Sequence, residues 1–217
     1  MLKNILLSLI AILLAAEAHA VSCHCFNQRD YDPKAPGAVD PYVLATAGNS
    51  LIAGAFGLEK SDIVRQRMTG EEETGIWIAA ASAKASGRDF RDFLASRAKE
   101  GTWKRALAVS GIDPARLGAN FPAALDAGES AAARALAEAV FAKSFKADNL
   151  KLSTLRADGA TIPETAVALY LGLQMKADPD AIFKKVKSGG TTWGKLLTES
   201  NIPPHSLSAR IIAQASP

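Results

Sequence analysis

Residues 102–117 read TWKRALAVSGIDPARL, and residues 192–207 read TWGKLLTESNIPPHSL. The two stretches lie 90 positions apart and share a Thr-Trp start, matching apolar positions and an Ile-x-Pro end. Upstream matches continue at an offset of 89, which a single inserted residue explains. The paired positions are Leu107/Leu197, Ser110/Ser200, Ile112/Ile202, Pro114/Pro204, Leu117/Leu207, Phe93/Phe183, Ala79/Ala168, Gly70/Gly159, Arg67/Arg156, Ile63/Leu152 and Phe56/Phe145. The sequence therefore predicts an internal duplication.

Both copies carry the start and stop signals of helices. Thr102 and Thr192 are typical N-cap residues, and the helices that they start are predicted to end at Gly111 and Asn201, which adopt the left-handed conformation readily. Alternation of β-branched and polar residues is absent along the chain, so we predict an all-α fold. The other predicted N-caps are Ser61, Asp89, Thr161 and Asp178, and a further Ala-rich helix is predicted over residues 131–146.

The duplication and the chain ends divide the sequence into five parts. We predict two tandem homologous multi-helix units that follow a signal peptide and a Pro-rich N-terminal arm. The predicted boundaries are 1–20 for the signal peptide, 21–44 for the arm, 45–118 for helical unit 1, 119–133 for a linker and 134–217 for helical unit 2.

The first twenty residues have the pattern of a secretory signal peptide. Lys3 precedes an apolar run over residues 5–16, and Ala18-His19-Ala20 is a small-x-small cleavage signal. The alternative is a lipoprotein signal in which Cys23 carries the lipid. No later stretch approaches the roughly 20 apolar residues of a membrane span. The sequence therefore predicts a periplasmic or secreted protein without a transmembrane span.

Composition excludes several classes of chemistry. The chain has 217 residues, two cysteines, three histidines and a formal net charge of +3. These numbers leave no room for a disulfide lattice, a multi-haem chain or a cysteine-rich zinc array. The positive charge is mild and evenly spread, so we do not expect nucleic acid as a partner.

One stretch resembles a phosphate-binding loop without completing the motif. Gly189, Gly194 and Lys195 have the spacing of the first seven positions, but Leu196 stands where a Ser or Thr should hold magnesium. The preceding residues 182–188 have a helical pattern, whereas the motif requires a strand. We therefore expect no nucleotide binding here.

The strongest chemical signal is Cys23-His24-Cys25, which holds both cysteines of the chain. Two thiolates separated by one residue can face one ion, and soft sulfur favours Cu(I) or Zn(II). A closed zinc site needs three or four ligands, so His24, His205, a carboxylate or a second molecule would have to complete it. Two alternatives stay open: a strained, readily reduced disulfide, and cysteines used only for disulfide attachment to a partner or for lipidation.

Other conspicuous residues have simpler explanations. We expect Trp103 and Trp193 to be buried core residues, and the acidic run of residues 71–73 to be a solvated turn. Catalytic motifs are absent, and few histidines are available as general bases.

We therefore predict a non-enzymatic exported helical protein whose arm holds a soft metal ion. The first alternative is a scaffold that binds another envelope protein. The second is a small thiol-disulfide or metal-dependent enzyme.

Overall fold

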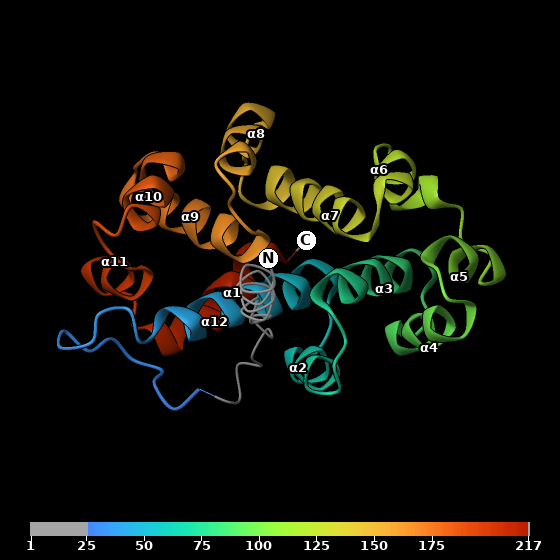
Figure 1. Cartoon of the computed structure of the whole chain (residues 1–217), viewed down its shortest axis with the longest axis horizontal. Coiled ribbons are helices and arrows are strands. Elements are labelled where there is room, and N and C mark those ends of the chain that lie inside the picture. Colours follow the sequence, from blue (N-terminus) through green and yellow to red (C-terminus); the bar gives the residue numbers. More distant parts are fainter. Residues whose placement is uncertain (1–25, 217) are drawn as a thin grey trace, which may run out of the picture.

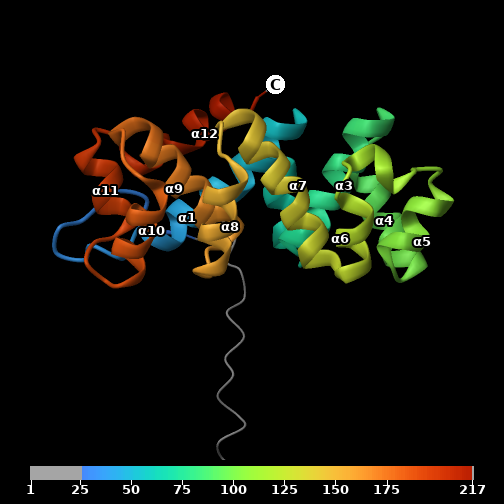
Figure 2. The ribbon, with the colours of Figure 1, turned by 90° about the horizontal axis from the view of Figure 1, so that it is seen from above.

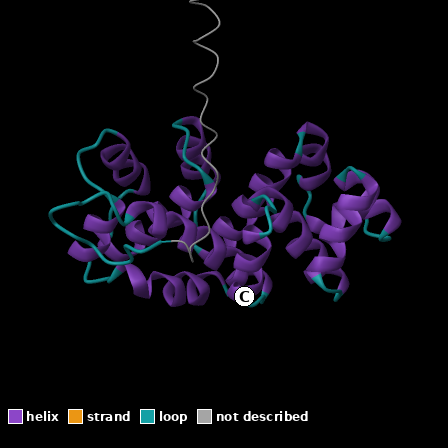
Figure 3. Cartoon of the chain, turned by 60° about the horizontal axis from the view of Figure 1, so that its bottom comes forward, coloured by secondary structure: helices purple, strands orange, loops and turns teal. Residues whose placement is uncertain are grey.

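The computed structural model describes residues 26–216, and this part of the chain consists of α-helices, two short 3₁₀ helices and loops, without a β-strand (Figures 1 and 3). The prediction of an all-α fold is confirmed. The helices are α1 (Asp40–Phe56), α2 (Lys60–Met68), α3 (Glu73–Ser86), α4 (Phe90–Glu100), α5 (Trp103–Val109), η2 (Pro114–Leu117), α6 (Phe121–Ala127), α7 (Glu129–Ser144), α8 (Asn149–Ala157), α9 (Ile162–Met175), α10 (Pro179–Lys187), α11 (Trp193–Glu199), η3 (Pro204–Ser206) and α12 (Leu207–Ala215).

Most of the predicted helix ends are confirmed. The side chain of Thr161 accepts a hydrogen bond from the backbone N–H of Glu164, whose carboxylate accepts one from the backbone of Thr161 in return, forming a capping box. Gly111 and Asn201 both have positive φ, of 70° and 56°, as predicted for helix ends. Side-chain N-cap bonds also form at Asp89, Thr102, Asp178 and Thr192.

Three local predictions differ from the structure. Ser61 is not a cap, because α2 already begins at Lys60 after the extended residue Glu59. The helix α1 begins at Asp40, where the sequence predicted an extended arm as far as residue 44. The stretch predicted as a linker, residues 119–133, contains α6 and the start of α7. Gly128 separates these two helices and has a φ of 127°, a value that residues with a side chain rarely adopt.

The two longest helices pack crosswise on the two halves of the chain, which we call the N-terminal half (α1–α6) and the C-terminal half (α7–α12). Helix α1 packs against α9 and α12, and α7 packs against α3 and α6. The first helix of each half thus contacts the third and the last α-helix of the other half. In Figures 1 and 2 the helices α10 and α11 lie at one end of the long axis and α4 and α5 at the other, with α1, α3, α7 and α9 between them.

One continuous core joins the halves. Trp77, Trp103 and Trp193 are each at most 2% exposed, so the prediction that Trp103 and Trp193 are core residues is confirmed. Helices α1 and α12 approach closely at Gly54, where a Cβ atom would lie 2.6 Å from the carbonyl oxygen of Ile212. Only glycine permits this contact, because any side chain there would collide with backbone. Among residues 26–216, no helix is both long and apolar enough to cross a bilayer.

Candidate functional site

Of the predicted metal ligands, only His205 belongs to the described part of the chain; Cys23, His24 and Cys25 lie outside it. His205 stands in η3 and is exposed. Its Nδ1 atom lies 2.6 Å from Oδ1 of Asp30, a residue of the N-terminal arm. The structure therefore places His205 beside Asp30, an arm residue that follows Cys25 by five positions in the sequence.

The arm follows α11 because two side chains hold it there. The Thr192 hydroxyl donates a hydrogen bond of 2.9 Å to the carbonyl oxygen of Pro36. The carboxylate of Asp40 accepts bonds from the backbone N–H groups of Trp193 and Gly194, at 3.1 and 2.8 Å. These are free donors at the start of α11, where the helix dipole also favours negative charge. The connection between the arm and α1 is thus tied to the helix that precedes His205, as the blue segment in Figure 1 shows.

Burial affects the carboxylate of Asp40. Desolvation raises its pKa above the ordinary value of 3.8, and the two backbone hydrogen bonds from Gly194 and Trp193 oppose that rise. A Cβ atom at Gly194 would overlap the side chain of Val39, so only glycine allows the arm to approach α11 this closely.

Aromatic contacts hold the first described residues of the arm against α1. The ring of Phe26 meets Tyr42 edge-on with centroids 6.2 Å apart, and the guanidinium of Arg29 lies 6.0 Å from the centroid of the same tyrosine ring. The Arg29 Nε also donates a 3.2 Å hydrogen bond to the carbonyl of Phe26. These contacts define the course of the arm between Phe26 and Asp30.

The Asp30–His205 pair determines which imidazole nitrogen is free to bind a ligand. A proton on Nδ1, donated to the carboxylate, leaves Nε2 with a lone pair. Within residues 26–216, no cluster of three His, Cys, Asp or Glu side chains could hold a metal ion. Any metal bound by His205 would therefore need ligands from outside this part of the chain.

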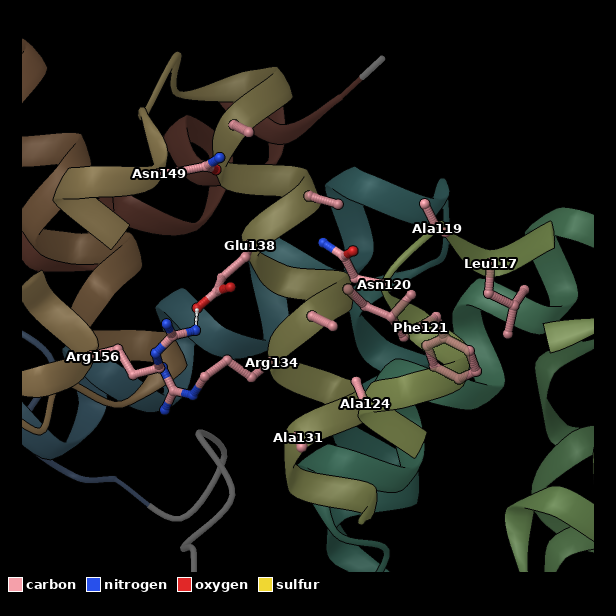
Figure 4. A pocket seen from close by; sticks show the side chains of 15 residues that line it. Leu117, Ala119, Asn120, Phe121, Ala124, Ala131, Arg134, Glu138, Asn149 and Arg156 are labelled. Atoms are coloured by element: carbon pink, nitrogen blue, oxygen red, sulfur yellow. Dashed lines mark hydrogen bonds and ion pairs between the residues drawn. The ribbon is translucent and has the colours of Figure 1, made fainter. Parts of the chain in front are cut away.

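A second candidate site is a groove of about 490 Å³ between α6, α7 and α8 (Figure 4). Arg156 forms an ion pair of 2.9 Å with Glu138, and Arg134 donates a bond of 3.2 Å to the carbonyl of Ala160. The amides of Asn120 and Asn149 also line it. The groove is lined by both arginine and glutamate side chains, and each of its two arginines already has a partner within the protein.

The acidic run contradicts one prediction. Glu72 is exposed, but Glu73 begins α3 and is half-buried, so this residue is not part of a solvated turn. Desolvation raises the pKa of Glu73, while the positive charges of Arg67 and Arg134 and the nearby Trp77 lower it. No local pattern in the sequence indicates this burial, because both arginines come from other helices.

Sequence reasoning also missed Asp30 and Asp40. Asp30 belongs to a polar, Pro-containing stretch, and nothing local indicates that it meets a residue 175 positions away. Asp40 has the residue type of an ordinary helix start, and only its tertiary contact shows that it caps a different helix.

Comparison with known proteins adds no family assignment. No protein-family model matches the chain, no curated protein matches it, and no solved structure matches its fold.

Proposed function

We propose that this protein is an exported, non-enzymatic metal-binding protein that holds one soft ion, Cu(I) or Zn(II), on its N-terminal arm. The proposed ligands are the thiolates of Cys23 and Cys25 with the imidazoles of His24 and His205. The proposed export rests on the signal-peptide pattern of residues 1–20. The single observation that carries the proposal is the contact between His205 and Asp30.

That contact has the form that supports a metal-ligating histidine. Such histidines almost always donate their second ring N–H to a carboxylate, a backbone carbonyl or water, which orients the imidazole and increases its basicity as a ligand. Asp30 supplies this carboxylate from the arm itself, at 2.6 Å. Cys25 and Cys23 precede Asp30 by five and seven residues, which span at most about 18 and 25 Å when extended, so the arm that brings Asp30 to His205 leaves both thiols able to approach it.

Metal content measured on the mature protein tests the proposal. We expect about one equivalent of copper or zinc per chain after anaerobic purification, and none in a Cys23→Ser, Cys25→Ser double variant. His205→Ala and Asp30→Asn should each lower metal affinity by about 10- to 100-fold. Asn27→Ala, a change of an exposed arm residue that removes no proposed ligand, is the matched control and should bind metal as the unmodified protein does.

The same preparation separates the proposal from its alternatives. The exposed His205–Asp30 pair contributes little to stability, so His205→Ala should change the free energy of unfolding by less than about 0.5 kcal/mol. Equal metal content in the native protein and the double cysteine variant would refute metal binding. Intact mass showing lipid on Cys23, or a disulfide to a second protein, would instead favour the envelope scaffold.

We further propose that the two halves arose by duplication. In support, α2 and α8 each have 9 residues, α3 and α9 have 14, and α5 and α11 have 7. The crosswise contacts are also paired: α1 with α9 and α7 with α3. An experimental structure should superpose the halves after a rotation near 180°, with Thr102 over Thr192. Halves that fail to superpose in this register would contradict the duplication.

A further inference from the structure

A second groove, distinct from that of Figure 4, lies between α3 and α7 and has a volume of about 280 Å³. The end of α1, the 3₁₀ helix η2 and the end of α12 close its sides. Its walls are apolar: Phe56, Leu117, Leu136 and Val140 contribute the larger side chains, and alanines fill the rest. We call this the α3/α7 groove.

Three basic side chains line the α3/α7 groove, and no Asp or Glu is among its lining residues. They are Lys84 on α3, Arg116 on η2 and Lys143 on α7. Arg116 donates one bond, of 2.9 Å, to the carbonyl of Ala85. Among residues 26–216 none of the three has a carboxylate within ion-pair distance, although nine other ion pairs of Lys or Arg form in this part of the chain.

Together these features favour one class of ligand. An apolar recess gains free energy when it covers a hydrocarbon chain, and a concave wall covers more of that chain than a flat surface does. Three cations without counter-charges create a positive potential that attracts an anion to the same place. A molecule that carries both a hydrocarbon chain and an anionic end satisfies both features at once.

We propose that the α3/α7 groove binds a free medium-chain carboxylate, with its hydrocarbon chain between α3 and α7 and its carboxylate among Lys84, Arg116 and Lys143. A single chain suits a recess of this volume, whereas a membrane surface is bound by an exposed, convex apolar face. This proposal uses none of the residues assigned to metal binding, so either can fail without the other.

Calorimetric titration of the full mature protein with decanoate, kept below its micelle concentration, tests the proposal. We expect saturable binding at one site. The neutral alcohol of equal length, decanol, should bind about tenfold more weakly because it lacks the charge. The cation decylamine should not bind measurably, since it meets three positive side chains.

Matched variants locate the site. The triple variant Lys84→Ser, Arg116→Ser, Lys143→Ser should lose about tenfold or more in decanoate affinity, whereas Lys99→Ser, an exposed lysine outside the groove, should change it less than twofold. Val140→Asp places a negative charge on the groove wall and should weaken binding by at least tenfold. Its control, Val109→Asp, changes an exposed valine of α5 that does not line the groove and should have no effect.

Thermal melting of each variant, compared with the unmodified protein, shows that a loss of binding is not a loss of fold. Tighter binding of decanoate than of decanol, abolished by the groove variants and kept by the controls, would support the proposal. The proposal is overturned by unchanged affinity in the triple variant, by equal binding of decanol, or by retention on anionic vesicles without binding of free decanoate.

Discussion

Helices α5 and α11 both start with a Thr-Trp pair, but the two starts contact very different neighbours. Thr102 and Thr192 each accept a hydrogen bond three residues ahead, and Trp103 and Trp193 are equally buried. At α11, the carboxylate of Asp40 also accepts hydrogen bonds from the backbone N–H groups of Trp193 and Gly194. At α5 no carboxylate does so among the described residues.

The space beside α5 is instead a polar pocket of about 410 Å³. Glu71, Glu72 and the Arg97–Glu129 ion pair line it together with Trp103, whose buried Nε1 has no hydrogen-bond partner in the described part of the chain. Glu129 begins α7 as Asp40 begins α1, yet it pairs with an arginine side chain rather than with the helix start. A capping residue thus determines where a helix begins, whereas the tertiary neighbours of the helix determine whether that start is covered.

The largest expected effect on stability comes from adding a side chain at Gly194, where the chain beside the arm packs against α11. Gly194→Val would force the new side chain against Val39 and push the arm from α11. We expect a loss of about 2–3 kcal/mol in the free energy of unfolding, typical of overpacking. Lys104→Val, at the matching and exposed position of α5, is the control and should cost far less. Urea unfolding measures both, and equal losses would show that the arm does not pack here.

Removing the carboxylate that covers α11 should have the next largest effect. Asp40→Ala leaves the N–H groups of Trp193 and Gly194 without an acceptor and should cost about 1–2 kcal/mol. Glu129→Ala removes only a partly exposed ion pair with Arg97 and should cost less than about 1 kcal/mol. Guanidinium unfolding of both variants gives the ranking, and the reverse order would contradict this account of the two helix starts.

The two threonine caps should differ by a smaller amount. Each substitution removes the hydroxyl that accepts a hydrogen bond from a backbone N–H, so Thr102→Ala should cost about 1 kcal/mol. Thr192→Ala should cost about 0.5–1.5 kcal/mol more, because its hydroxyl also donates to the carbonyl of Pro36. Thermal melting of the pair, referred to the unmodified protein, checks the difference. Identical losses would mean that the bond to the arm contributes nothing.

The smallest expected effect is on how the stability of the protein depends on pH. The raised pKa of Asp40 means that its contribution to stability is full below 3.8 and is lost as the pH rises through the raised value. Asp89, the cap of α4, behaves oppositely: hydrogen bonds and the charge of Arg91 lower its pKa to about 2, so its contribution is present above 3.8 and is lost as the pH falls towards 2. Stability measured against pH should lose the first trend in Asp40→Asn and the second in Asp89→Asn.

Sequence reasoning succeeded where the physics is local. Helix ends depend on a few neighbouring residues, so the caps at Asp89, Thr102, Thr161, Asp178 and Thr192 could be read directly. The failure at Ser61 has a local cause too, because the turn of α2 begins one residue earlier without any side-chain cap. A serine permits a helix start there but does not require one.

The candidate sites depend on tertiary contacts and were largely hidden. His205 was a candidate from residue type alone, and its partner Asp30 comes from the opposite end of the chain. The burial of Glu73 depends on charges from α2 and α7, which no spacing in the sequence brings together. The α3/α7 groove combines residues from five helices, so its unpaired cations look like ordinary solvated lysines and arginine until the helices are packed.

The crosswise packing also governs how the chain must fold. Ser50 of α1 meets Ser208 of α12 at 2.9 Å, across 158 positions of sequence. Among residues 26–216, the first helix, α1, therefore waits for the last, α12, before their shared contacts can form, which gives folding a late closing step. Until residues 207–215 have been made, the side of α1 that packs against α12 has no cover, and we expect a chain truncated before them to be a substrate for chaperones or proteases rather than a smaller version of the protein.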